Sequence, residues 1–389
     1  MRIGINAMVL GPRDTGVGIW TRGLLKALPR ADRENLYMVY HRREAGSLTA
    51  EPGENVRFLR AALPSGGRLG RIAWEQLVLP AHARRDRLDV LHCPAYVMPR
   101  WSGAPAVVTL HDLFVYTHPG LCKRLNVLHY RLMLPATIRR AALLHCTSHW
   151  TRGILCALLP WAAERARVIH PAVDDAFGPQ DPQAVEDFLR RQGLQERPFL
   201  FVGNIEPKKN VVALLEAMAL LREEYGSQRK LVMVGAEGWG WRRPEEKIRE
   251  LGLQDQIVRL GYVPRRELPL IYASALALVF PSVVEGFGLP PLEAMACGTP
   301  VITSGAGGLA ESVGAAALLV REPNPDFLAE AMYQIEASED LRRRLSEAGL
   351  FRARSFRWDG AAKQFLELYR EAAGGRLEER RPVDAGPPR

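Results

Sequence analysis

The sequence predicts an α/β protein of two doubly wound domains that face each other across a cleft. Apolar runs of strand length alternate with helical patterns along the chain, which is typical of parallel sheets covered by helices on both faces. This alternation stops at a polar, proline-punctuated stretch and then restarts with a similar rhythm. At roughly 100–200 residues per domain, the 389 residues are enough for two domains. We therefore expect a pair of Rossmann-like domains, which bind ligands at the carboxyl ends of their strands.

The first predicted domain covers residues 1–173. Its first strand, residues 2–10, opens into a loop rich in Gly and Pro, residues 11–18, and a helical pattern follows at residues 19–28. The further apolar runs of strand length in this domain lie at residues 36–40, 56–59, 90–93, 106–110, 142–147 and 168–169.

A connection at residues 174–198 separates the domains and holds one amphipathic helix, residues 182–192. The second predicted domain covers residues 199–355. The alternation starts again with a strand at residues 199–202 and a helix at residues 210–221. It continues with elements at residues 231–234, 244–251, 257–260, 267–273, 277–280, 290–297, 300–303 and 316–320, and amphipathic helices are expected at residues 325–337 and 340–354. A last helix occupies residues 356–373. The tail, residues 374–389, has too little apolar surface to offset the entropy of ordering, so we expect it to be disordered.

Composition and cysteine spacing exclude several classes of protein. Apolar residues make up 47% and charged residues 24%, as in a globular chain. The longest apolar stretches, residues 276–281 and 315–320, are far shorter than the ~20 residues of a membrane span, and the N-terminus lacks the apolar core of a secretory signal. The five cysteines form no Cys-x-x-Cys pair, which argues against a disulfide framework and a zinc site. We expect a cytoplasmic protein with reduced thiols.

Positive charge is concentrated in the first half of the chain. Residues 1–172 hold 24 Lys and Arg against 11 Asp and Glu, a net charge of +13, whereas the whole chain carries +9. This asymmetry points to nucleic acid, an anionic membrane surface or a phosphorylated substrate, or else only to a solvated basic surface. Residues 123–140 mix basic with large apolar side chains, which suits either the inner face of an anionic membrane or a core helix with a basic outer face. We expect Pro135 to interrupt that helix.

The most specific motif is residues 281–300, which read PSVVEGFGLPPLEAMACGTP. A strand ends at Phe280, a Gly-rich loop follows, and a helix is expected from about Pro290. The start of this helix offers a partial positive charge and unpaired backbone donors, which suit a phosphate group. Those donors are the backbone N–H groups of Phe287, Gly288 and Leu289.

Two carboxylates flank this turn. Glu285 precedes the helix and Glu293 lies one turn inside it. Carboxylates on either side of an anion-binding turn can divide the contacts to a ligand, one reaching sugar hydroxyls and the other a ribose. The alternative is a loop carboxylate in water for Glu285 and a solvated helix face for Glu293.

Two features of the first domain point to its expected cleft. Gly16 and Gly18 allow a tight turn or a close approach of backbone to a ligand. A dinucleotide fingerprint would need a third glycine where Thr21 stands, which speaks against a nicotinamide or flavin enzyme. His111 follows the strand at residues 106–110 and can hydrogen-bond a sugar hydroxyl or a phosphate oxygen, unless it is a structural histidine.

These segments together resemble the signature of the family 4 glycosyltransferases, retaining nucleotide-sugar enzymes of the two-domain GT-B fold. The segments that agree in order and spacing are residues 15–18, 108–113, 168–174, 202–210, 260–263, 281–300 and the helix led by Trp358. The resemblance covers residues 2–373. It implies that the first domain binds the acceptor, that the second domain binds the nucleotide sugar, and that the C-terminal helix crosses back to the first domain.

The resemblance also implies site residues. It assigns Glu285 to the donor sugar hydroxyls, Glu293 to the ribose, and Lys209 with its neighbour Lys208 to the diphosphate. Asn204 stands where many members carry Arg, so the diphosphate is expected to depend more on Lys209, the start of the helix near Pro290 and Arg265. The catalytic residues so implied are His111, Glu285 and Lys209. The donor-binding residues so implied are Gly16, Gly18, Asn204, Lys208, Lys209, Tyr262, Val263, Glu285, Gly286, Phe287, Gly288, Leu289 and Glu293.

The function implied by the resemblance is transfer of a hexose, with retention, from a nucleoside diphosphate sugar to a saccharide or polyprenyl-linked acceptor in cell-surface polysaccharide synthesis. Residues 111–119 resemble the branch that contains mannosyltransferases, which makes GDP-mannose the expected donor. No cofactor and no metal are expected, because lysines and backbone donors can neutralise the diphosphate and the sequence has no Asp-x-Asp motif. The alternatives are a nucleotide-sugar epimerase or a sugar phosphorylase of the same architecture. A basic nucleic-acid-binding protein is disfavoured by the absence of a nucleic-acid-binding motif.

Overall fold

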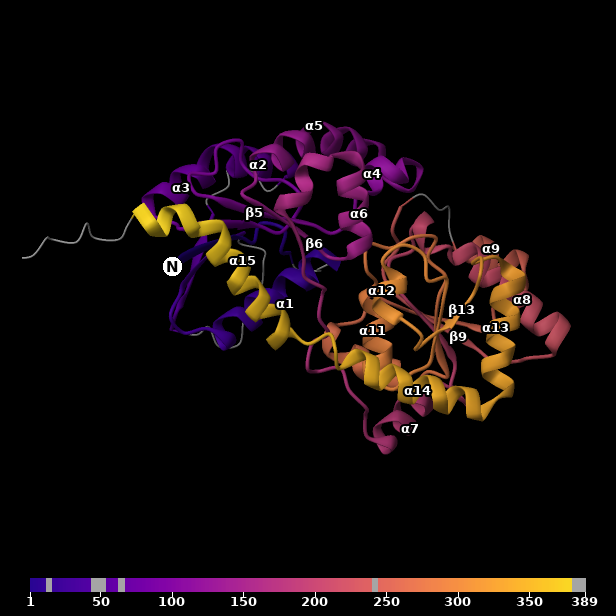
Figure 1. The fold of residues 1–389 in the computed structure, drawn as a ribbon. Helices are drawn as coiled ribbons and strands as arrows, with labels where there is room; N and C mark the ends of the chain where they lie inside the picture. Colours follow the sequence, from indigo (N-terminus) through magenta and orange to yellow (C-terminus); the bar gives the residue numbers. More distant parts are fainter. Residues whose placement is uncertain (12–15, 43–53, 62–66, 240–243, 380–389) are drawn as a thin grey trace, which may run out of the picture. The chain divides into compact units, whose positions relative to one another are not determined.

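The computed structural model describes residues 1–11, 16–42, 54–61, 67–239 and 244–379, which form two units, each built on one parallel sheet (Figure 1). The first unit joins Met1–Pro171 to the C-terminal segment that starts at Trp358, and the second unit is Ala172–Arg357. The expected pair of Rossmann-like domains and the return of the C-terminal helix to the first of them are confirmed.

In the described part of the chain, the sheet of the first unit has seven parallel strands in the order β3-β2-β1-β4-β5-β6-β7. Its strands are β1 Arg2–Asn6, β2 Leu36–His41, β3 Val56–Arg60, β4 Val90–Cys93, β5 Ala106–Leu110, β6 Leu143–Cys146 and β7 Ala166–Val168. The chain adds β2 and β3 on one side of β1 and β4 on the other. The winding therefore reverses between β1 and β4, and open α/β sheets bind ligands at the carboxyl end of such a switch point.

The C-terminal helix covers the first unit beside the first helix of the chain. The helical segments of this unit are α1 Gly16–Ala31, α2 Arg68–Ala73, the π-helix η2 Trp74–Val78, α3 Leu79–Arg85, α4 Phe114–Thr117, η3 Pro119–Leu121, α5 Arg124–Arg140, α6 His149–Leu158, η4 Pro160–Arg165 and α15 Trp358–Glu379. Figure 1 shows α15, in yellow, running along α1. The two helices meet where the indole of Trp358 packs onto Gly23, at a place where any Cβ would overlap the ring.

A buried chain of hydrogen bonds joins α15 to the sheet of the first unit. The carbonyl of Ile169 can only accept, so Nε2 of His145 donates to it (2.8 Å) and the Thr109 hydroxyl donates to Nδ1 of His145 (2.9 Å). Nε2 of His92 then donates to the Thr109 oxygen (2.8 Å), and the hydroxyl of Tyr369 donates to Nδ1 of His92 (2.7 Å). Burial lowers the pKa of His145 to about 3 and also lowers the pKa of His92, so both rings are neutral at pH 7 and hold α15 in place.

The second unit contains six parallel strands among its described residues, in the order β10-β9-β8-β11-β12-β13. Its strands are β8 Phe199–Val202, β9 Leu231–Val234, β10 Ile257–Gly261, β11 Ala277–Phe280, β12 Val301–Thr303 and β13 Leu318–Leu319. Its helices are α7 Pro182–Arg191, η5 Pro207–Lys209, α8 Val211–Tyr225, α9 Pro244–Glu250, η6 Arg265–Glu267, α10 Leu268–Ala273, α11 Leu289–Ala296, α12 Leu309–Val313, α13 Pro325–Ala337 and α14 Glu339–Ala353. Here the winding reverses between β8 and β11.

Two segments differ from the expectation because of packing. The expected connection at residues 174–198 is part of the second unit, where Val185, Phe188 and Leu194 lie in the same buried cluster as strand residues of its sheet. The expected interruption at Pro135 is wrong, because α5 runs through it from Arg124 to Arg140. Proline inside a helix costs about 3 kcal/mol, which burial of the neighbouring Leu134 and Ile138 in the core offsets at ~1.5–3 kcal/mol each.

The start of α1 and the end of α15 also differ from the expectation. The loop at residues 11–18 was expected to include Gly16 and Gly18, but α1 begins at Gly16, so Gly18 is a buried residue of its first turn. The C-terminal helix continues to Glu379, six residues into the segment expected to be disordered, because Arg, Leu and Glu there favour a helix. Residues 12–15 and 380–389 lie outside the described residues.

Candidate functional site

The switch point of the second unit brings two loops together. The loop after β8 carries Lys208 and Lys209 in η5, and the loop after β11 carries Glu285. A backbone hydrogen bond from the Val283 N–H to the Lys208 carbonyl (2.8 Å) joins the loops. The carboxyl ends of adjacent strands thus place residues about 75 positions apart in the chain side by side.

Glu285 is held between two lysines. Its Oε1 accepts a hydrogen bond from Nζ of Lys209 at 2.6 Å, and its Oε2 lies 3.6 Å from Nζ of Lys208. The residue is only 7% exposed. Burial alone would raise its pKa, but the charges of Lys208 and Lys209 outweigh burial and lower the pKa of Glu285 to about 2. The carboxylate is therefore ionised at neutral pH.

Lys209 occupies a closed environment. Burial lowers the pKa of Lys209, and the charge of Glu285 partly offsets that effect. Its Nζ lies 4.3 Å from the centroid of the Phe280 ring, a cation–π distance. An ammonium group that is poorly hydrated but held in place can stabilise developing negative charge on a ligand.

The loop that follows Glu285 presents backbone rather than side chains. Its Gly288 has φ +99°, a left-handed conformation that favours glycine, and this residue caps α11 at Leu289. Burial of the Phe287 side chain against Phe356, with ring centroids 5.5 Å apart, leaves its backbone as the part that can meet a ligand. Pro290 and Pro291 have no N–H, so the donors that the start of α11 can offer to an anion are the N–H groups of Gly288 and Leu289.

Glu293 is buried on the inner side of α11, not on a solvated face. It is 3% exposed, its Oε1 accepts from Nη2 of Arg265 (2.8 Å), and its Oε2 accepts from the hydroxyl of Tyr272 (3.0 Å). The Arg265 guanidinium also stacks on the ring of Phe177 at 4.7 Å. Both carboxylate oxygens thus have protein partners, and a ribose bound here would share Glu293 with Arg265.

Tyr272 is a site residue that the sequence analysis missed. Arg265, which the sequence analysis expected to help bind the diphosphate, pairs with Glu293 in the structure. Tyr272 carries no signal in the sequence, because its hydrogen bond to Glu293 depends on how α10 packs on α11.

The remaining predicted donor contacts of the second unit lie on loops that follow three of its strands. Asn204 follows β8 and is half-buried, whereas Tyr262 follows β10 with an exposed ring and Val263 packs partly against the core. Gly286 lies between Glu285 and Phe287 in the loop described above. These positions stay predictions as donor contacts.

His111 lies in the first unit, directly after β5. Its Nε2 donates to the carbonyl of Pro94 at 2.8 Å, since a carbonyl only accepts, and its ring forms a T-shaped contact with the ring of Trp20, with centroids 5.2 Å apart. Burial lowers the pKa of His111, although Asp112 and the bond to Pro94 oppose that effect. The imidazole is therefore neutral at pH 7, and the lone pair is on Nδ1.

Two known families match successive parts of this chain. Residues 15–177 match the family described as Glycosyltransferase Family 4, and residues 186–350 match Glycosyl transferases group 1. The O-antigen chain mannosyltransferase B of Escherichia coli is 32% identical over 296 residues, which cover 75% of this chain and 76% of that relative. The chain belongs to glycosyltransferase family 4.

Solved structures agree with this assignment at the level of the fold. Sucrose-phosphate synthase from Thermosynechococcus elongatus superposes on this glycosyltransferase with a TM-score of 0.77 at 25% identity, over 96% of this chain and 100% of that one. HepE from Anabaena, solved with UDP-glucose, superposes with a TM-score of 0.74 at 20% identity, over 94% and 98% of the two chains. The GT-B architecture implied by the sequence motifs is thereby confirmed.

For a glycosyltransferase, the site of the second unit combines the two kinds of group that a nucleotide sugar needs. Lys208, Lys209 and the start of α11 offer positive charge to a diphosphate, and Glu285 offers an acceptor to hydroxyl groups. A phosphate that takes hydrogen bonds from Lys209 and a hydroxyl that donates to Glu285 would replace part of the Lys209–Glu285 pair. The ion pair holds Lys209 and Glu285 next to each other at the ends of β8 and β11.

Proposed function

We propose that this glycosyltransferase moves a hexose from a nucleoside diphosphate sugar to a saccharide or polyprenyl-linked acceptor, with retention, in cell-surface polysaccharide synthesis. The observation that carries the proposal is the contact of Lys209 with Glu285 at 2.6 Å beside Lys208. This arrangement supports the proposal because it combines positive charge that suits a diphosphate with a carboxylate that suits sugar hydroxyls.

In the proposed reaction, the acceptor oxygen bonds to the anomeric carbon while the bond from that carbon to the phosphate oxygen breaks. The acceptor proton passes to the leaving phosphate oxygen, so no protein base is required opposite the leaving group. Lys209 and Lys208 stabilise the negative charge that grows on the diphosphate, a role for which the proposed reaction needs no metal ion. His111 contributes a hydrogen-bond acceptor, Nδ1, to a sugar hydroxyl.

GDP-mannose is the proposed donor. The support is the mannosyltransferase name of the Escherichia coli relative together with the resemblance of residues 111–119 to that branch. The experiment measures the thermal shift and the turnover of the protein with GDP-mannose, UDP-glucose and ADP-glucose. We expect GDP-mannose to give the largest shift and to be turned over. Preference for a different nucleotide sugar would show that the proposed donor is wrong, but it would not contradict the proposed reaction class.

The same experiment separates a transferase from the epimerase and phosphorylase alternatives. With donor alone, a transferase should release nucleoside diphosphate slowly by hydrolysis. An epimerase would convert the donor sugar without releasing nucleotide, and a phosphorylase would depend on inorganic phosphate. Conversion of the donor sugar would contradict the proposal.

We also propose that α5 lies against an anionic membrane surface. No helix within the described residues is long and apolar enough to cross a membrane. However, Leu125, Leu128 and Leu132 are 74%, 60% and 69% exposed, and their spacing of three and four residues puts them on one face of α5. Arg124 and Arg131 lie beside this stripe of leucines. Apolar and cationic groups therefore share the surface, as in helices that bind a bilayer interface.

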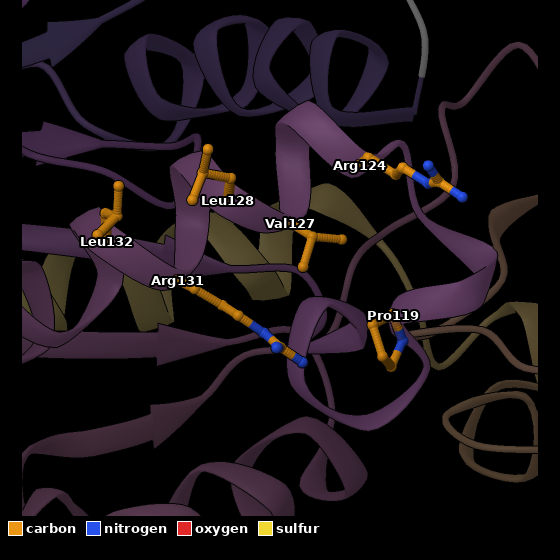
Figure 2. Close-up of a pocket in the computed structure, with 6 residues that line it drawn as sticks. All are labelled: Pro119, Arg124, Val127, Leu128, Arg131 and Leu132. Atoms are coloured by element: carbon orange, nitrogen blue, oxygen red, sulfur yellow. The ribbon is translucent and has the colours of Figure 1, made fainter.

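A cavity of about 380 Å³ adjoins the stripe (Figure 2). Figure 2 shows Arg131 extending from α5 toward the segment that carries Pro119. Its Nε donates to the Val115 carbonyl at 2.8 Å, which fixes the guanidinium at this place. A fixed cation beside exposed leucines suits the headgroup region of an anionic bilayer.

The prediction for this surface is that the protein sediments with vesicles of phosphatidylglycerol and phosphatidylcholine, but not with phosphatidylcholine alone. The triple variant Leu125→Ser, Leu128→Ser and Leu132→Ser should weaken this binding at least about tenfold, because each buried leucine contributes roughly 1.5–3 kcal/mol. Phe351→Ser removes an equally exposed side chain from the second unit and is the control. Equal binding of the triple variant and the control would contradict membrane docking through α5.

A further inference from the structure

The switch point of the first unit carries a polar cluster that no part of the proposed donor site uses. In the second unit, Lys209 and Glu285 lie at the switch point between β8 and β11. In the first unit, the equivalent place is the carboxyl end of β1 and β4, which are parallel neighbours with Ile5 opposite His92. Asn6 is the last residue of β1, and Glu75 reaches it from the π-helix η2.

The cluster consists of Asn6, Glu75 and Arg71. Nδ2 of Asn6 donates to Oε1 of Glu75 at 3.1 Å. Nε of Arg71 lies 3.9 Å from Oε2 of Glu75, which is an ion pair but too long for a hydrogen bond. That Nε is buried and has no hydrogen-bond partner among the described residues, while the Glu75 side chain is 17% exposed. The group therefore has one donor and one carboxylate oxygen that a ligand could complete.

The backbone around Glu75 holds it at this place. Five residues, Trp74–Val78, form a π-helix, a rare conformation that occurs often at functional sites. On one side of Glu75, Trp74 is buried in the core next to Tyr40. On the other side, Gln76 donates to the Met98 carbonyl and accepts from the Arg100 N–H. The π-helical turn is thus fixed at both neighbours and directs Glu75 toward the end of β1.

Burial gives the Glu75 carboxyl an unusual environment. It raises the pKa of Glu75, while Arg71 and the hydrogen bond from Asn6 oppose the change. Cys93, the last residue of β4, is close enough for Glu75 to add to the rise of the thiol pKa that burial causes. The carboxyl therefore lies between the ends of β1 and β4, at the point where the topology favours a ligand.

We infer that Glu75, with Asn6 and Arg71, binds a hydroxyl group of a neutral saccharide acceptor. This inference rests on the proposed function, because the donor occupies the switch point of the second unit and the acceptor is the other substrate of a transferase. Glu75 accepts a hydrogen bond from the sugar hydroxyl, and Nε of Arg71 donates a hydrogen bond to a neighbouring oxygen of the same sugar. Glu75 positions the acceptor and takes no proton in the reaction.

The experiment uses the full-length protein, the donor that is turned over, and the methyl α-glycosides of mannose, glucose and galactose as acceptors. Glu75→Gln keeps the shape of the side chain and loses its charge. It should lower kcat/KM for the best acceptor by roughly tenfold to 100-fold, the loss of one hydrogen bond to a charged group, mostly through KM. Arg71→Lys should also lower it, because lysine has no group in place of Nε. Donor hydrolysis and nucleoside diphosphate affinity should stay within about twofold.

The matched control is Glu371→Gln, which removes a carboxylate of the same unit that pairs with Arg167 on the surface. Unchanged acceptor kcat/KM in Glu75→Gln would overturn the inference, as would a parallel loss of donor affinity or a loss that follows only a lower melting temperature. Transfer to none of the three glycosides by a wild type that hydrolyses donor would also overturn it. A wild type that neither binds nor hydrolyses any nucleotide sugar would instead refute the proposed function.

Discussion

Glu285→Gln should lower kcat by about 10²–10³-fold, the size of effect seen when one stabilising group of a preorganised site is removed. The substitution keeps the shape of the side chain and removes the charge that sugar hydroxyls would contact. The affinity for nucleoside diphosphate should change much less, since we propose that the diphosphate contacts Lys208, Lys209 and the start of α11. Steady-state kinetics with varied donor, together with calorimetric titration of nucleoside diphosphate, measure the two effects separately.

The control for this prediction is Glu267→Gln, at an exposed glutamate of the same unit. It should leave both kcat and nucleotide affinity unchanged. Because the pKa of Glu285 is lowered to about 2, its ion pair stabilises the protein above the ordinary carboxyl pKa of 4.5 and loses that effect as the pH falls toward 2. The stability difference between wild type and Glu285→Gln should therefore shrink in acid. Equal losses of kcat and nucleotide affinity would contradict the assignment of Glu285 to the donor sugar.

Lys209→Ala should reduce kcat/KM for the donor by an amount equivalent to about 2–4 kcal/mol, with losses in both donor affinity and kcat. The variant removes the ammonium nearest to Glu285 from a closed environment where water cannot replace it. It also leaves the buried Glu285 with the more distant Lys208 as its charge partner, 3.6 Å away. The pKa of Glu285 should consequently rise in the variant, and donor turnover should fall more steeply below neutral pH than in the wild type.

Two further variants separate charge from packing. Lys209→Met retains the side-chain stem over Phe280 and removes the charge, so it should lose as much activity as Lys209→Ala while keeping more stability. Lys208→Ala should have a smaller effect, because its Nζ is farther from Glu285 and its side chain is more exposed, 23% against 11%. Wild-type kinetics in Lys209→Ala would exclude this lysine from diphosphate binding.

The strands and helices followed from the sequence because their signals are local. The predicted strand at residues 199–202 is β8, and the predicted helix at residues 325–337 is α13. The errors arose where long-range packing outweighs a local signal. Burial of Leu134 and Ile138 keeps α5 continuous through Pro135, and burial of Phe188 places the expected connection inside the second unit.

The candidate site divides in the same way. Glu285, Glu293 and Lys209 could be singled out from motifs and their resemblance to a family, but their partners could not. Glu293 is buried between Arg265 and Tyr272, which excludes the alternative that it lies on a solvated helix face. Glu75 escaped notice because its partner, Asn6, is 69 positions away in the chain.

The sequence alone therefore determined that the chain alternates strands with helices in two rounds, with a glycine-rich turn and two carboxylates after one strand. Periodicity and turn residues act over a few positions, so the chain itself records them. Only the tertiary structure decided which strands are neighbours, and hence where the winding reverses and which side chains meet there. Strand order brings Lys209 to Glu285 and Asn6 to Glu75, and these contacts between distant residues set the burial, charge and hydrogen bonding on which the proposed chemistry depends.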